Sequence, residues 1–340
     1  MTLPVQYEFS LRPFNTFGIE AKARAYLRVT SNDQLSAVKR DAELNALPRL
    51  VLGGGSNLLL TRDFPGLVLH MATTGVGIAG EDAEATFVKA AAGESWHRFV
   101  LWTLEQGLGG LENLSLIPGC VGASPIQNIG AYGVELKDCF HALTAFDFET
   151  GETFVLDKAA CHFGYRDSVF KHALRDRAAI LDVTFALPKQ WRANVQYADV
   201  AQELAACGVT APTPGQISDA VIAIRTRKLP DPAQIGNAGS FFKNPVVTQQ
   251  QRDALLAGYP KLVSYAQADG TFKLAAGWLI DQCGWKGRSL GLAGVYEKQA
   301  LVLVNRGGAT GRDIAQLAAA IQADVQAKFG VLLEPEPVFI

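Results

Sequence analysis

The chain has 340 residues, of which 49% are hydrophobic and 19% are charged, a composition typical of globular proteins and not of disordered ones. This length predicts about two domains and a substantial buried core. Lys and Arg number 31 against 33 Asp and Glu, and the net charge of −2 argues against general binding to nucleic acid or anionic membranes.

The first eight residues lack a basic stretch followed by an apolar run, and no apolar run approaches membrane-spanning length. We therefore expect neither a secretory signal nor membrane insertion. The cysteines are odd in number, widely spaced and never in a C-x-x-C pair, which argues against a zinc site or a disulfide framework and favours a reducing cytoplasm. They are Cys120, Cys139, Cys161, Cys207 and Cys283. No metal is expected.

A loop with three consecutive glycines follows the first predicted elements. Residues 25–29 predict a strand, and a capping box of Ser31 and Gln34 predicts one helix that continues until Pro48. Residues 50–52 then predict a buried strand that enters the loop. Its glycines expose backbone N–H groups that suit a phosphate or pyrophosphate, and the alternative is a long hairpin turn. The loop residues are Gly53, Gly54, Gly55, Ser56 and Asn57.

Residues 75–80 match the dinucleotide fingerprint G-x-G-x-x-G. A fingerprint that binds a dinucleotide opens a helix, whereas residues 85–90, which follow, have strand character. We therefore reject a Rossmann fold. After this strand, Ser95 predicts the start of an amphipathic helix that ends at Gly107.

A second candidate site is the loop over residues 116–133, which is rich in small residues and almost without charge. A loop this long and neutral is not an ordinary solvated linker. Its backbone amides, together with Gln127 or Asn128, predict contacts to a flat ligand rich in heteroatoms. Residues 140–148 and 152–156 then predict a β-hairpin.

Two segments with cationic side chains leave alternatives open. Arg166 is a surface residue, an ion-pair partner of Asp167, or a bidentate ligand for a carboxylate. Residues 213–228 predict a helix that starts with a capping box and ends with three cations. These cations either interact with the helix dipole or, through Lys228, bind a diphosphate. The Pro-rich step at 229–232 predicts a domain boundary.

The segment from Gly236 to Pro245 concentrates small, aromatic and polar residues. Its glycines leave the Ser240 hydroxyl presented and not packed. In an extended chain Phe241 and Phe242 point in opposite directions, so we expect one in the core and the other lining a pocket. The alternative is a Gly-rich turn that enters a strand.

The rest of the chain predicts a helix over 274–283, a buried strand over 300–305 and a final helix that begins with a capping box of Thr310 and Asp313. Prolines on both sides of Glu336 leave the last segment no easy route into a central sheet.

Taken in chain order, these motifs resemble those of the UDP-N-acetylenolpyruvoylglucosamine reductase family, and the insert that carries Tyr197 resembles its longer, type I branch. The motifs span nearly the whole chain, so the set is more specific than any one of them. They are residues 15–18, 53–57, 118–133, 165–168, 236–244 and 333–336.

The resemblance implies an α+β architecture. It consists of an FAD-binding fold of the vanillyl-alcohol oxidase type, made of two subdomains, and a third α+β domain that binds the substrate. The implied boundaries are residues 1–73 for the first subdomain, with residues 330–340 returning near the site, 74–228 for the second subdomain and 229–329 for the substrate domain.

The resemblance also implies a monomeric cytoplasmic flavoenzyme. Non-covalent FAD, recharged by NADPH, would reduce the enolpyruvyl ether of UDP-N-acetylglucosamine to UDP-N-acetylmuramate for peptidoglycan synthesis. Both loops would hold FAD, through Gly53, Gly54, Gly55, Ser56 and Asn57 in the first and Pro118, Gly119, Gly122, Ala123, Gln127, Asn128, Gly130 and Ala131 in the second.

Matching motif positions imply the catalytic roles. Arg166 would grip the substrate carboxylate, Glu336 would assist as an acid, and Ser240 would protonate the carbanion that hydride transfer leaves. Pro337 removes a backbone donor beside Glu336, which leaves the orientation of that acid open. The implied substrate-binding residues are Tyr132, Tyr197, Lys228, Asn244 and Gln299.

Two other enzyme classes compete with this interpretation. Residues 240–243 match the S-x-x-K of penicillin-binding acyl-transferases, but the nearest S-D-N candidate is Ser218-Asp219-Ala220 and K-T-G is absent. Another FAD oxidase or dehydrogenase of the same superfamily would share the fold. No His or Cys stands in an obvious covalent-flavin motif, and the substrate-binding positions favour the reductase.

Overall fold

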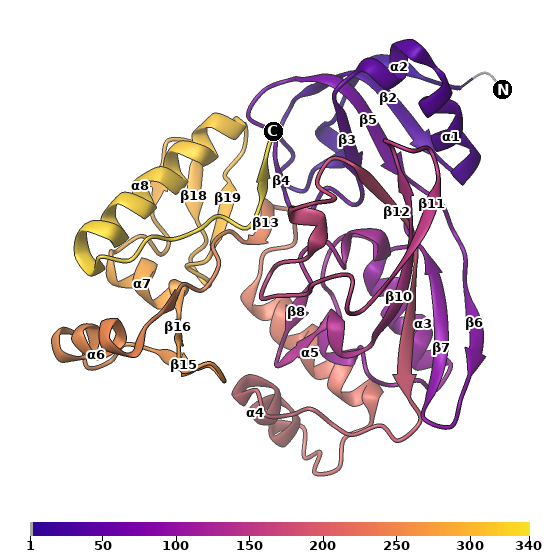
Figure 1. The fold of residues 1–340 in the computed structure, drawn as a ribbon. Coiled ribbons are helices and arrows are strands. Elements are labelled where there is room, and N and C mark those ends of the chain that lie inside the picture. Colours follow the sequence, from indigo (N-terminus) through magenta and orange to yellow (C-terminus); the bar gives the residue numbers. More distant parts are fainter. Residues whose placement is uncertain (1–2) are drawn as a thin grey trace. The chain divides into compact units, whose positions relative to one another are not determined.

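Figure 1 shows the fold in a computed structural model, which describes residues 3–340. The chain forms two compact units. The larger unit comprises the residues up to Phe9, residues 23–55 and residues 64–227, and the smaller unit comprises residues 10–22, 56–63 and 228–340. The step from 227 to 228 falls just before the Pro-rich segment that predicts a boundary. The finer division into three domains stays a prediction.

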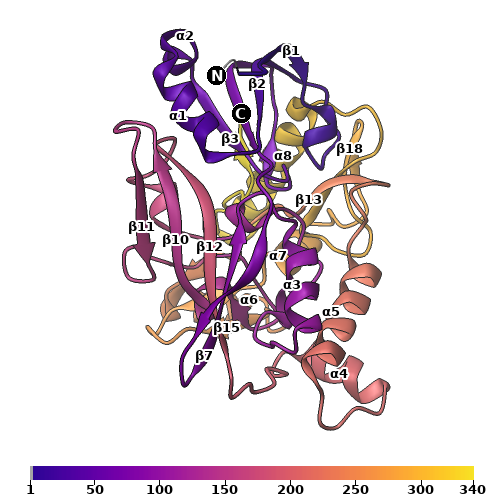
Figure 2. The same cartoon turned by 90° about the vertical axis from the view of Figure 1, so that its right-hand side faces the viewer.

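A four-stranded sheet in the larger unit has the order β1-β2-β5-β3. Strands β2, β5 and β3 run parallel, and helices α1 and α2 connect β2 to β3 beside the sheet (Figures 1 and 2). Parallel neighbours need such a crossover connection. The bounds are Gln6–Ser10 for β1, Lys22–Val29 for β2, Asn32–Arg40 for α1, Ala42–Ala46 for α2, Arg49–Leu52 for β3 and Phe64–Met71 for β5.

Helix α1 is shorter than predicted. The capping box of Ser31 and Gln34 is present at its start. The helix nevertheless ends at Arg40, because the Asp41 carboxylate accepts two backbone N–H groups and caps α2. The prediction of one helix up to Pro48 is therefore wrong.

A second, five-stranded sheet in the larger unit is antiparallel throughout, with the order β11-β10-β12-β7-β6. The predicted hairpin is confirmed as β10 and β11. Strand β6 carries most of the G-x-G-x-x-G stretch at the sheet edge, and because no helix follows it, the rejection of a Rossmann fold is confirmed. The bounds are Val76–Glu81 for β6, Ala85–Ala91 for β7, Phe140–Asp147 for β10, Thr153–Asp157 for β11 and Ala178–Pro188 for β12.

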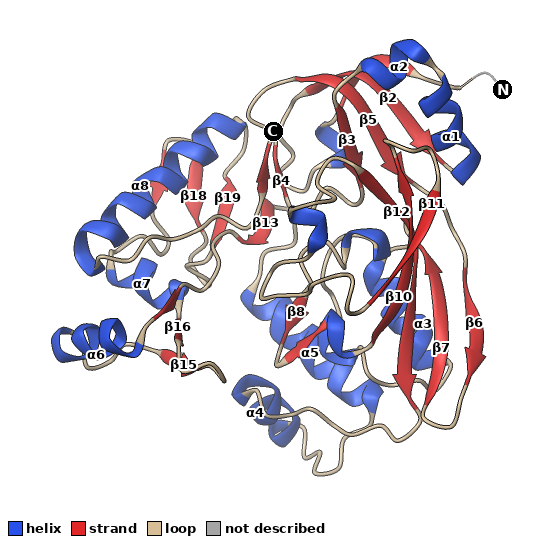
Figure 3. Cartoon of the chain, viewed as in Figure 1, coloured by secondary structure: helices blue, strands red, loops and turns tan. Residues whose placement is uncertain are grey.

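Three helices complete the larger unit (Figure 3), and the predicted capping box of Thr213 and Gln216 starts the longest of them, α5. Helix α4 is not predicted by the sequence, because Tyr197 at its N-cap accepts no capping hydrogen bond and only Val200 and Leu204 are buried. The bounds are Trp96–Glu105 for α3, Ala198–Ala206 for α4 and Pro214–Lys228 for α5. Short elements are β8 over Gly130–Ala131, β9 over Val134–Glu135, and 3-10 turns over Glu112–Leu114, Val121–Ala123, Leu136–Asp138 and Val169–Lys171.

An aromatic cluster joins α3 to the antiparallel sheet. Trp96, Phe99 and Phe185 are all fully buried, with ring centroids 4.9 to 5.9 Å apart. Rings at these separations contribute beyond the area that they bury. This packing fixes the position of α3.

The smaller unit is built on an antiparallel sheet with the order β13-β19-β18-β17. The predicted capping box of Thr310 and Asp313 starts helix α8, and Gly330 ends it in the left-handed conformation. The bounds are Gly236–Ser240 for β13, Ala276–Gln282 for α7, Ser289–Leu290 for β17, Ala293–Val295 for β18, Val302–Asn305 for β19 and Gly311–Phe329 for α8.

The smaller unit also contains elements that the sequence does not predict. A three-stranded sheet, β14-β16-β15, accompanies α6, and β20 near the C-terminus pairs in parallel with β4. Within residues 3–340, no helix is long and apolar enough to cross a bilayer. The bounds are Arg12–Phe14 for a 3-10 turn, Leu58–Leu59 for β4, Val246–Val247 for β14, Gln249–Gly258 for α6, Ser264–Ala266 for β15, Phe272–Leu274 for β16 and Val338–Phe339 for β20.

We expect Gly311→Ala to destabilise the protein, because a Cβ at this position would overlap the carbonyl oxygen of Leu60. The expected loss is about 1–3 kcal/mol of unfolding free energy, measured by urea denaturation. Gly258→Ala, at the end of α6 with no atom within 4 Å of the added Cβ, is the matched control. It should leave stability equal or slightly higher. Equal stability of the two variants would contradict the packing argument.

Candidate functional site

Two glycine loops meet in the larger unit with no side chain between them. A Cβ on Gly54 would lie 2.7 Å from the Cα of Gly119, and a Cβ on Gly53 would overlap the Sγ of Cys120. Real Cβ atoms do not approach so closely, so glycine is required at both positions of the first loop. The sequence predicts a cofactor loop at each of these places, and the structure brings the two together.

Backbone N–H groups converge around the buried Cys120 thiol at this contact. Burial raises the pKa of the Cys120 thiol, and neighbouring N–H groups act in the opposite direction by favouring negative charge. These N–H groups belong to Ala123, Gly54 and Gly122. Two of these N–H groups donate within the chain, that of Gly122 to the Ala92 carbonyl at 2.9 Å and that of Ala123 to the Cys120 carbonyl at 3.1 Å. What the two loops offer a cofactor is close approach to backbone without a Cβ in the way.

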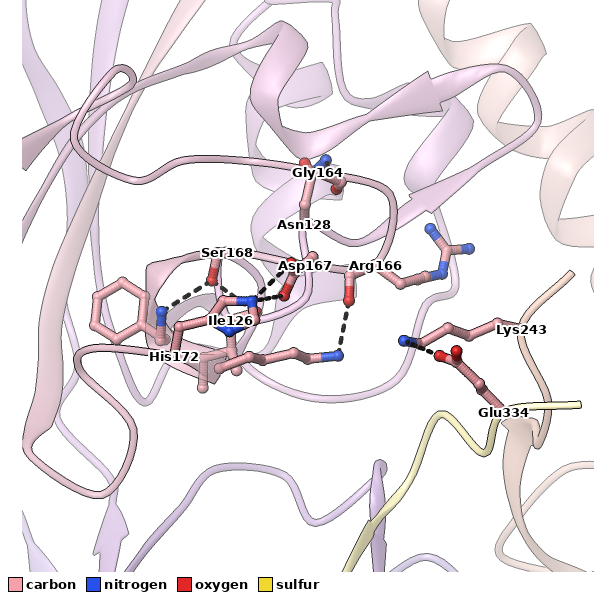
Figure 4. Close-up of polar contacts among 11 residues, drawn as sticks. Ile126, Asn128, Gly164, Arg166, Asp167, Ser168, His172, Lys243 and Glu334 are labelled. Carbon is pink, nitrogen blue, oxygen red and sulfur yellow. Dashed lines mark hydrogen bonds and ion pairs between the residues drawn. The ribbon is translucent and has the colours of Figure 1, made fainter. Parts of the chain in front are cut away.

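The segment around Arg166 is bonded to the second loop at three points. Ser168 Oγ donates to the Ile126 carbonyl at 2.7 Å and Asn128 Nδ2 donates to the Gly164 carbonyl at 3.0 Å (Figure 4). Arg166 Nη2 donates to the Gly130 carbonyl at 2.7 Å. The arginine therefore lies against the predicted cofactor loop.

Asp167 is not the ion-pair partner of Arg166. Both of its carboxylate oxygens bond His172 Nε2, at 2.8 and 2.9 Å (Figure 4). The alternative that Arg166 is an ion-pair partner of Asp167 is therefore wrong. Arg166 also has φ +55°, a left-handed conformation that non-glycine residues seldom adopt outside functional sites.

Asn128 supports the loop from inside. Its side chain is fully buried, its Oδ1 accepts the N–H of Lys137, and its Nδ2 also lies 3.2 Å from Glu135 Oε2. Gln127 and Asn128 are the two side-chain amides predicted to face the ligand, and the Asn128 amide is occupied by hydrogen bonds within the protein. Asn128 shares its left-handed backbone with Leu116 and Tyr132, so strain is concentrated in this loop.

Tyr132 and Tyr197 come together although 65 positions (197 − 132) separate them. Their rings meet edge to face with centroids 5.3 Å apart. The hydroxyl of Tyr132 bonds the side chain of Arg225, and burial raises the pKa of Tyr132. Both tyrosines were predicted to bind the substrate. Arg225, one of the three cations predicted at the end of this helix, had no substrate role assigned from the sequence.

Arg227, next along α5, pairs with Glu203 at 2.7 Å. Of the three cations at the end of this helix, Arg225 and Arg227 thus bond side chains within the larger unit. Lys228 is the last helical residue.

Ser240 ends strand β13 in the smaller unit and is exposed. Two positions of this strand favour glycine: a Cβ on Gly236 would overlap the carbonyl oxygen of Phe17, and Gly239 has φ +68°. Asn237 Oδ1 accepts the N–H of Gly239 at 2.9 Å, which stabilises this turn of the backbone. The hydroxyl is thus presented, as predicted.

Phe241 and Phe242 are both fully buried. The prediction that one of them lines a pocket is wrong. Their rings meet at 5.2 Å, and Phe241 also contacts Phe17 and Phe339. Phe242 forms an antiparallel bridge with Pro335, so the C-terminal segment covers this part of the chain.

The segment around Glu336 forms a short antiparallel ladder with the segment after Ser240. Lys243 N–H donates to the Glu334 carbonyl at 2.9 Å, and Glu336 N–H donates to the Phe241 carbonyl at 2.8 Å. Lys243 Nζ also pairs with Glu334 at 3.0 Å (Figure 4). Two predicted catalytic residues, Ser240 and Glu336, are therefore held in adjoining segments of one unit.

Asn57 fixes Glu336 from the other side. Its Nδ2 donates to the Glu336 carbonyl at 3.2 Å, and its carbonyl accepts the N–H of Val338 at 2.9 Å. The missing donor of Pro337 is thus compensated, because peptide groups on both sides of this proline are bonded.

Two predicted substrate-binding amides have structural contacts of their own. Asn244 Oδ1 accepts the N–H of Ala276 at the start of α7, at 2.9 Å. Gln299 Oε1 accepts the N–H of Leu301 at 3.3 Å. These contacts fix both side chains within the smaller unit.

Comparisons with known proteins agree with this geometry. Residues 231–340 match the family model described as UDP-N-acetylenolpyruvoylglucosamine reductase, C-terminal domain, and residues 23–157 match that of an FAD binding domain. The chain is 58% identical to the UDP-N-acetylenolpyruvoylglucosamine reductase of Paraburkholderia phymatum, covering 99% of this chain and 98% of the relative. The chain belongs to the UDP-N-acetylenolpyruvoylglucosamine reductase family.

A second relative of the same name has comparable sequence identity, and a solved structure of the same name shares the fold at lower identity. Identity to the enzyme of that name from Burkholderia orbicola is 60%, over 96% of this chain and 95% of the relative. The crystal structure of UDP-N-acetylenolpyruvylglucosamine reductase from Thermus caldophilus has a TM-score of 0.68 at 23% identity, covering 100% of this chain and 99% of that one. The predicted family, fold class and oxidoreductase class are confirmed, and FAD is the cofactor.

We expect Gly54→Ala to abolish FAD binding while the protein stays folded, because the new Cβ would separate the two loops. The measurement is flavin absorbance of the purified protein, with circular dichroism as the test of folding. Gly77→Ala, on the edge strand β6 with open space around the added Cβ, is the control and should retain FAD. Full flavin content in the Gly54 variant would show that the loops do not form the cofactor site.

Proposed function

We propose that this chain reduces the enolpyruvyl ether of UDP-N-acetylglucosamine to UDP-N-acetylmuramate in peptidoglycan synthesis, with NADPH as the reductant. Membership of the reductase family carries the proposal. The FAD, when bound, takes two electrons from NADPH and supplies a hydride to the carbon–carbon double bond of the substrate. The remaining chemistry belongs to side chains of this protein.

Arg166 binds the substrate carboxylate. Its guanidinium offers donors in a planar fork that matches a carboxylate, and one of them already bonds the Gly130 carbonyl at 2.7 Å. That bond, with the left-handed backbone, fixes the side chain before substrate arrives. As hydride adds to the double bond, negative charge spreads to this carboxylate, and a fixed cation stabilises it without reorganisation.

Ser240 donates the proton to the carbon next to the carboxylate. A serine hydroxyl is a weak acid, so the position of the donor and the stabilisation of its alkoxide must provide the rate. Exposure at the end of β13 and the tight packing of Gly236 support a hydroxyl held at one place. Glu336 assists as an acid from the segment paired with Phe241.

Tyr197, Lys228 and Asn244 bind the diphosphate and uridine end of the substrate. Tyr132 and Gln299 make further substrate contacts. The contact between the two tyrosine rings and the cation at Arg225 support an anionic group near Tyr132. The proposal includes a monomer in the cytoplasm, and the free thiols of all five cysteines agree with a reducing compartment.

The acyl-transferase alternative does not fit the structure. An S-x-x-K motif needs its serine and lysine one helical turn apart on the same face. Here Ser240 ends a strand, and Lys243 pairs with Glu334 at 3.0 Å. The local geometry therefore supports a proton donor and not a nucleophile activated by this lysine.

We expect Ser240→Ala to separate the two half-reactions. Anaerobic NADPH should still bleach the flavin absorbance, while turnover with the enolpyruvyl substrate should fall by about 10²–10⁴-fold because the proton donor is lost. Ser289→Ala, an exposed serine on β17 of the same sheet, is the control and should turn over normally. Near-normal turnover in the Ser240 variant would remove this residue from the proposed role.

We expect Arg166→Lys to lower kcat/KM by about 100-fold or more, because an ammonium group cannot reproduce the planar two-point grip. Steady-state kinetics give the measurement, and the flavin spectrum confirms that the cofactor is retained. Arg175→Lys is the matched control, since Arg175 is exposed and pairs only loosely with Asp176 at 3.7 Å. Equal kinetics for the two variants would rule out a carboxylate grip by Arg166.

A further inference from the structure

Residues 113–116, which lead to the predicted FAD-binding positions that begin at Pro118, make side-chain hydrogen bonds to several other parts of the larger unit. Asn113 Nδ2 donates to the carbonyls of Tyr132, at 3.0 Å, and Asn194, at 2.9 Å. Trp96 Nε1 donates to the Leu114 carbonyl at 2.9 Å. We call residues 113–116 the anchor segment.

The anchor segment continues in the same way. Ser115 is fully buried, and its hydroxyl lies 2.8 Å from that of Ser218 on α5. Two helices, α3 and α5, thus supply the partners for consecutive residues. These contacts fix a segment whose regular structure ends with the 3-10 turn at Leu114.

Leu116, the last residue of the anchor segment, is held on both sides of its peptide. Its N–H donates to His97 Nδ1 on α3 at 3.0 Å, and its carbonyl accepts from Arg225 Nε on α5 at 3.2 Å. The residue has φ +57°, a conformation that costs leucine energy unless surrounding contacts maintain it. Only Ile117 separates it from Pro118 and Gly119, where the cofactor loop begins.

The hydrogen bond to Leu116 requires a neutral imidazole. A backbone N–H can donate to Nδ1 only when this nitrogen carries no proton, so the proton of the neutral ring resides on Nε2. Burial lowers the pKa of His97, and the nearby Arg225 lowers it further. Protonation of Nδ1 would place a ring N–H opposite the N–H of Leu116. Two donors would then face each other, and the hydrogen bond would be lost.

We propose that His97 is a positioning residue: its neutral imidazole, with Arg225, holds the Leu116 peptide and thereby sets the place of the loop that binds FAD. Protonation of His97 releases the anchor segment and weakens FAD binding. The inference rests on the assignment of residues 118–131 to FAD, which is part of the proposed function.

Few charged groups act on this contact. Arg225 on α5 is the cation that faces the ring, and its side chain also bonds the Tyr132 hydroxyl. Glu112, in the 3-10 turn that packs on α3, is committed elsewhere: its Oε1 accepts from Trp191 Nε1 at 2.7 Å and its Oε2 from the N–H of Gly110. The acid response is therefore expected to follow the ionisation of His97.

The sign of the pH dependence follows from the lowered pKa. A histidine that stays neutral in the folded state stabilises it above the ordinary pKa of 6.5, and this contribution is lost as the pH falls through the lower pKa of the folded state. We expect the Kd of FAD to rise as the pH falls below 6.5, with the midpoint at the pKa of His97.

The first test measures FAD affinity by flavin fluorescence between pH 7.5 and 5.0 in the full chain. His97→Asn retains an acceptor near the position of Nδ1 and does not titrate, so it should bind FAD within about threefold of wild type at pH 7.5 and lose the His97 transition. His97→Leu leaves the Leu116 N–H without an acceptor and should bind about tenfold more weakly at pH 7.5. His141→Asn, an exposed histidine on β10, is the control and should keep the wild-type pH profile.

The second test reads the ring directly. Nitrogen NMR of labelled histidine, assigned with His97→Asn, should show an unprotonated Nδ1 at pH 7.5 and a pKa below 6.5. Arg225→Gln removes the cation and should move this pKa upwards. The measurement needs no turnover, so it stands even where a variant is inactive.

The outcomes separate the two proposals. Wild-type affinity in His97→Leu, or an unchanged acid transition in His97→Asn, would overturn the role of His97 while the proposed reductase stands. A protonated Nδ1 at pH 7.5 would overturn it as well. A wild-type protein that binds no FAD at any pH would instead overturn the loop assignment on which this inference rests.

Discussion

Direct contact between two stretches of backbone is the constraint on which the cofactor site depends. Gly54 lies so close to Gly119 that a single methyl group would part them. This contact leaves the backbone of both loops open to close approach, because neither glycine carries a Cβ. Every other feature of the second loop serves to hold this approach: the buried Asn128 amide, the anchor segment, and the left-handed residues that bend the chain.

Strained backbone needs compensation, and its sources differ between the units. In the larger unit, helices α3 and α5 supply side chains to individual peptide groups of Leu114 and Leu116. In the smaller unit, a backbone hydrogen bond to Phe241 holds the segment around Glu336 on one side. On the other side, the Asn57 side chain donates to the Glu336 carbonyl. Both devices hold a reacting or binding group on a rigid support, which lowers the cost of ordering it when the ligand arrives.

The sequence predicted much of the fold because local signals were strong. The capping boxes at Ser31, Thr213 and Thr310 all start helices, and the hairpin of β10 and β11 is present. The failures have local causes too. Asp41 competes for a helix start and divides the predicted helix, and α4 has no capping hydrogen bond to mark it. Phe242 is buried where it forms an antiparallel bridge with Pro335, and alternation along a strand does not predict this long-range contact.

The sequence by itself determined the residue types at the proposed site: glycines where backbones must meet, Arg166 with a guanidinium suited to a carboxylate, and Ser240 as a presented hydroxyl. Their motifs are contiguous, so each leaves a readable pattern. Only the tertiary structure decided which partners hold them. His97 and Leu116 lie 19 positions apart, and Arg225 and Leu116 lie 109 apart. A hydrogen bond from a side chain to a distant peptide group requires no particular residue at the peptide, so it leaves no pattern in the sequence. Folding alone brings such groups together.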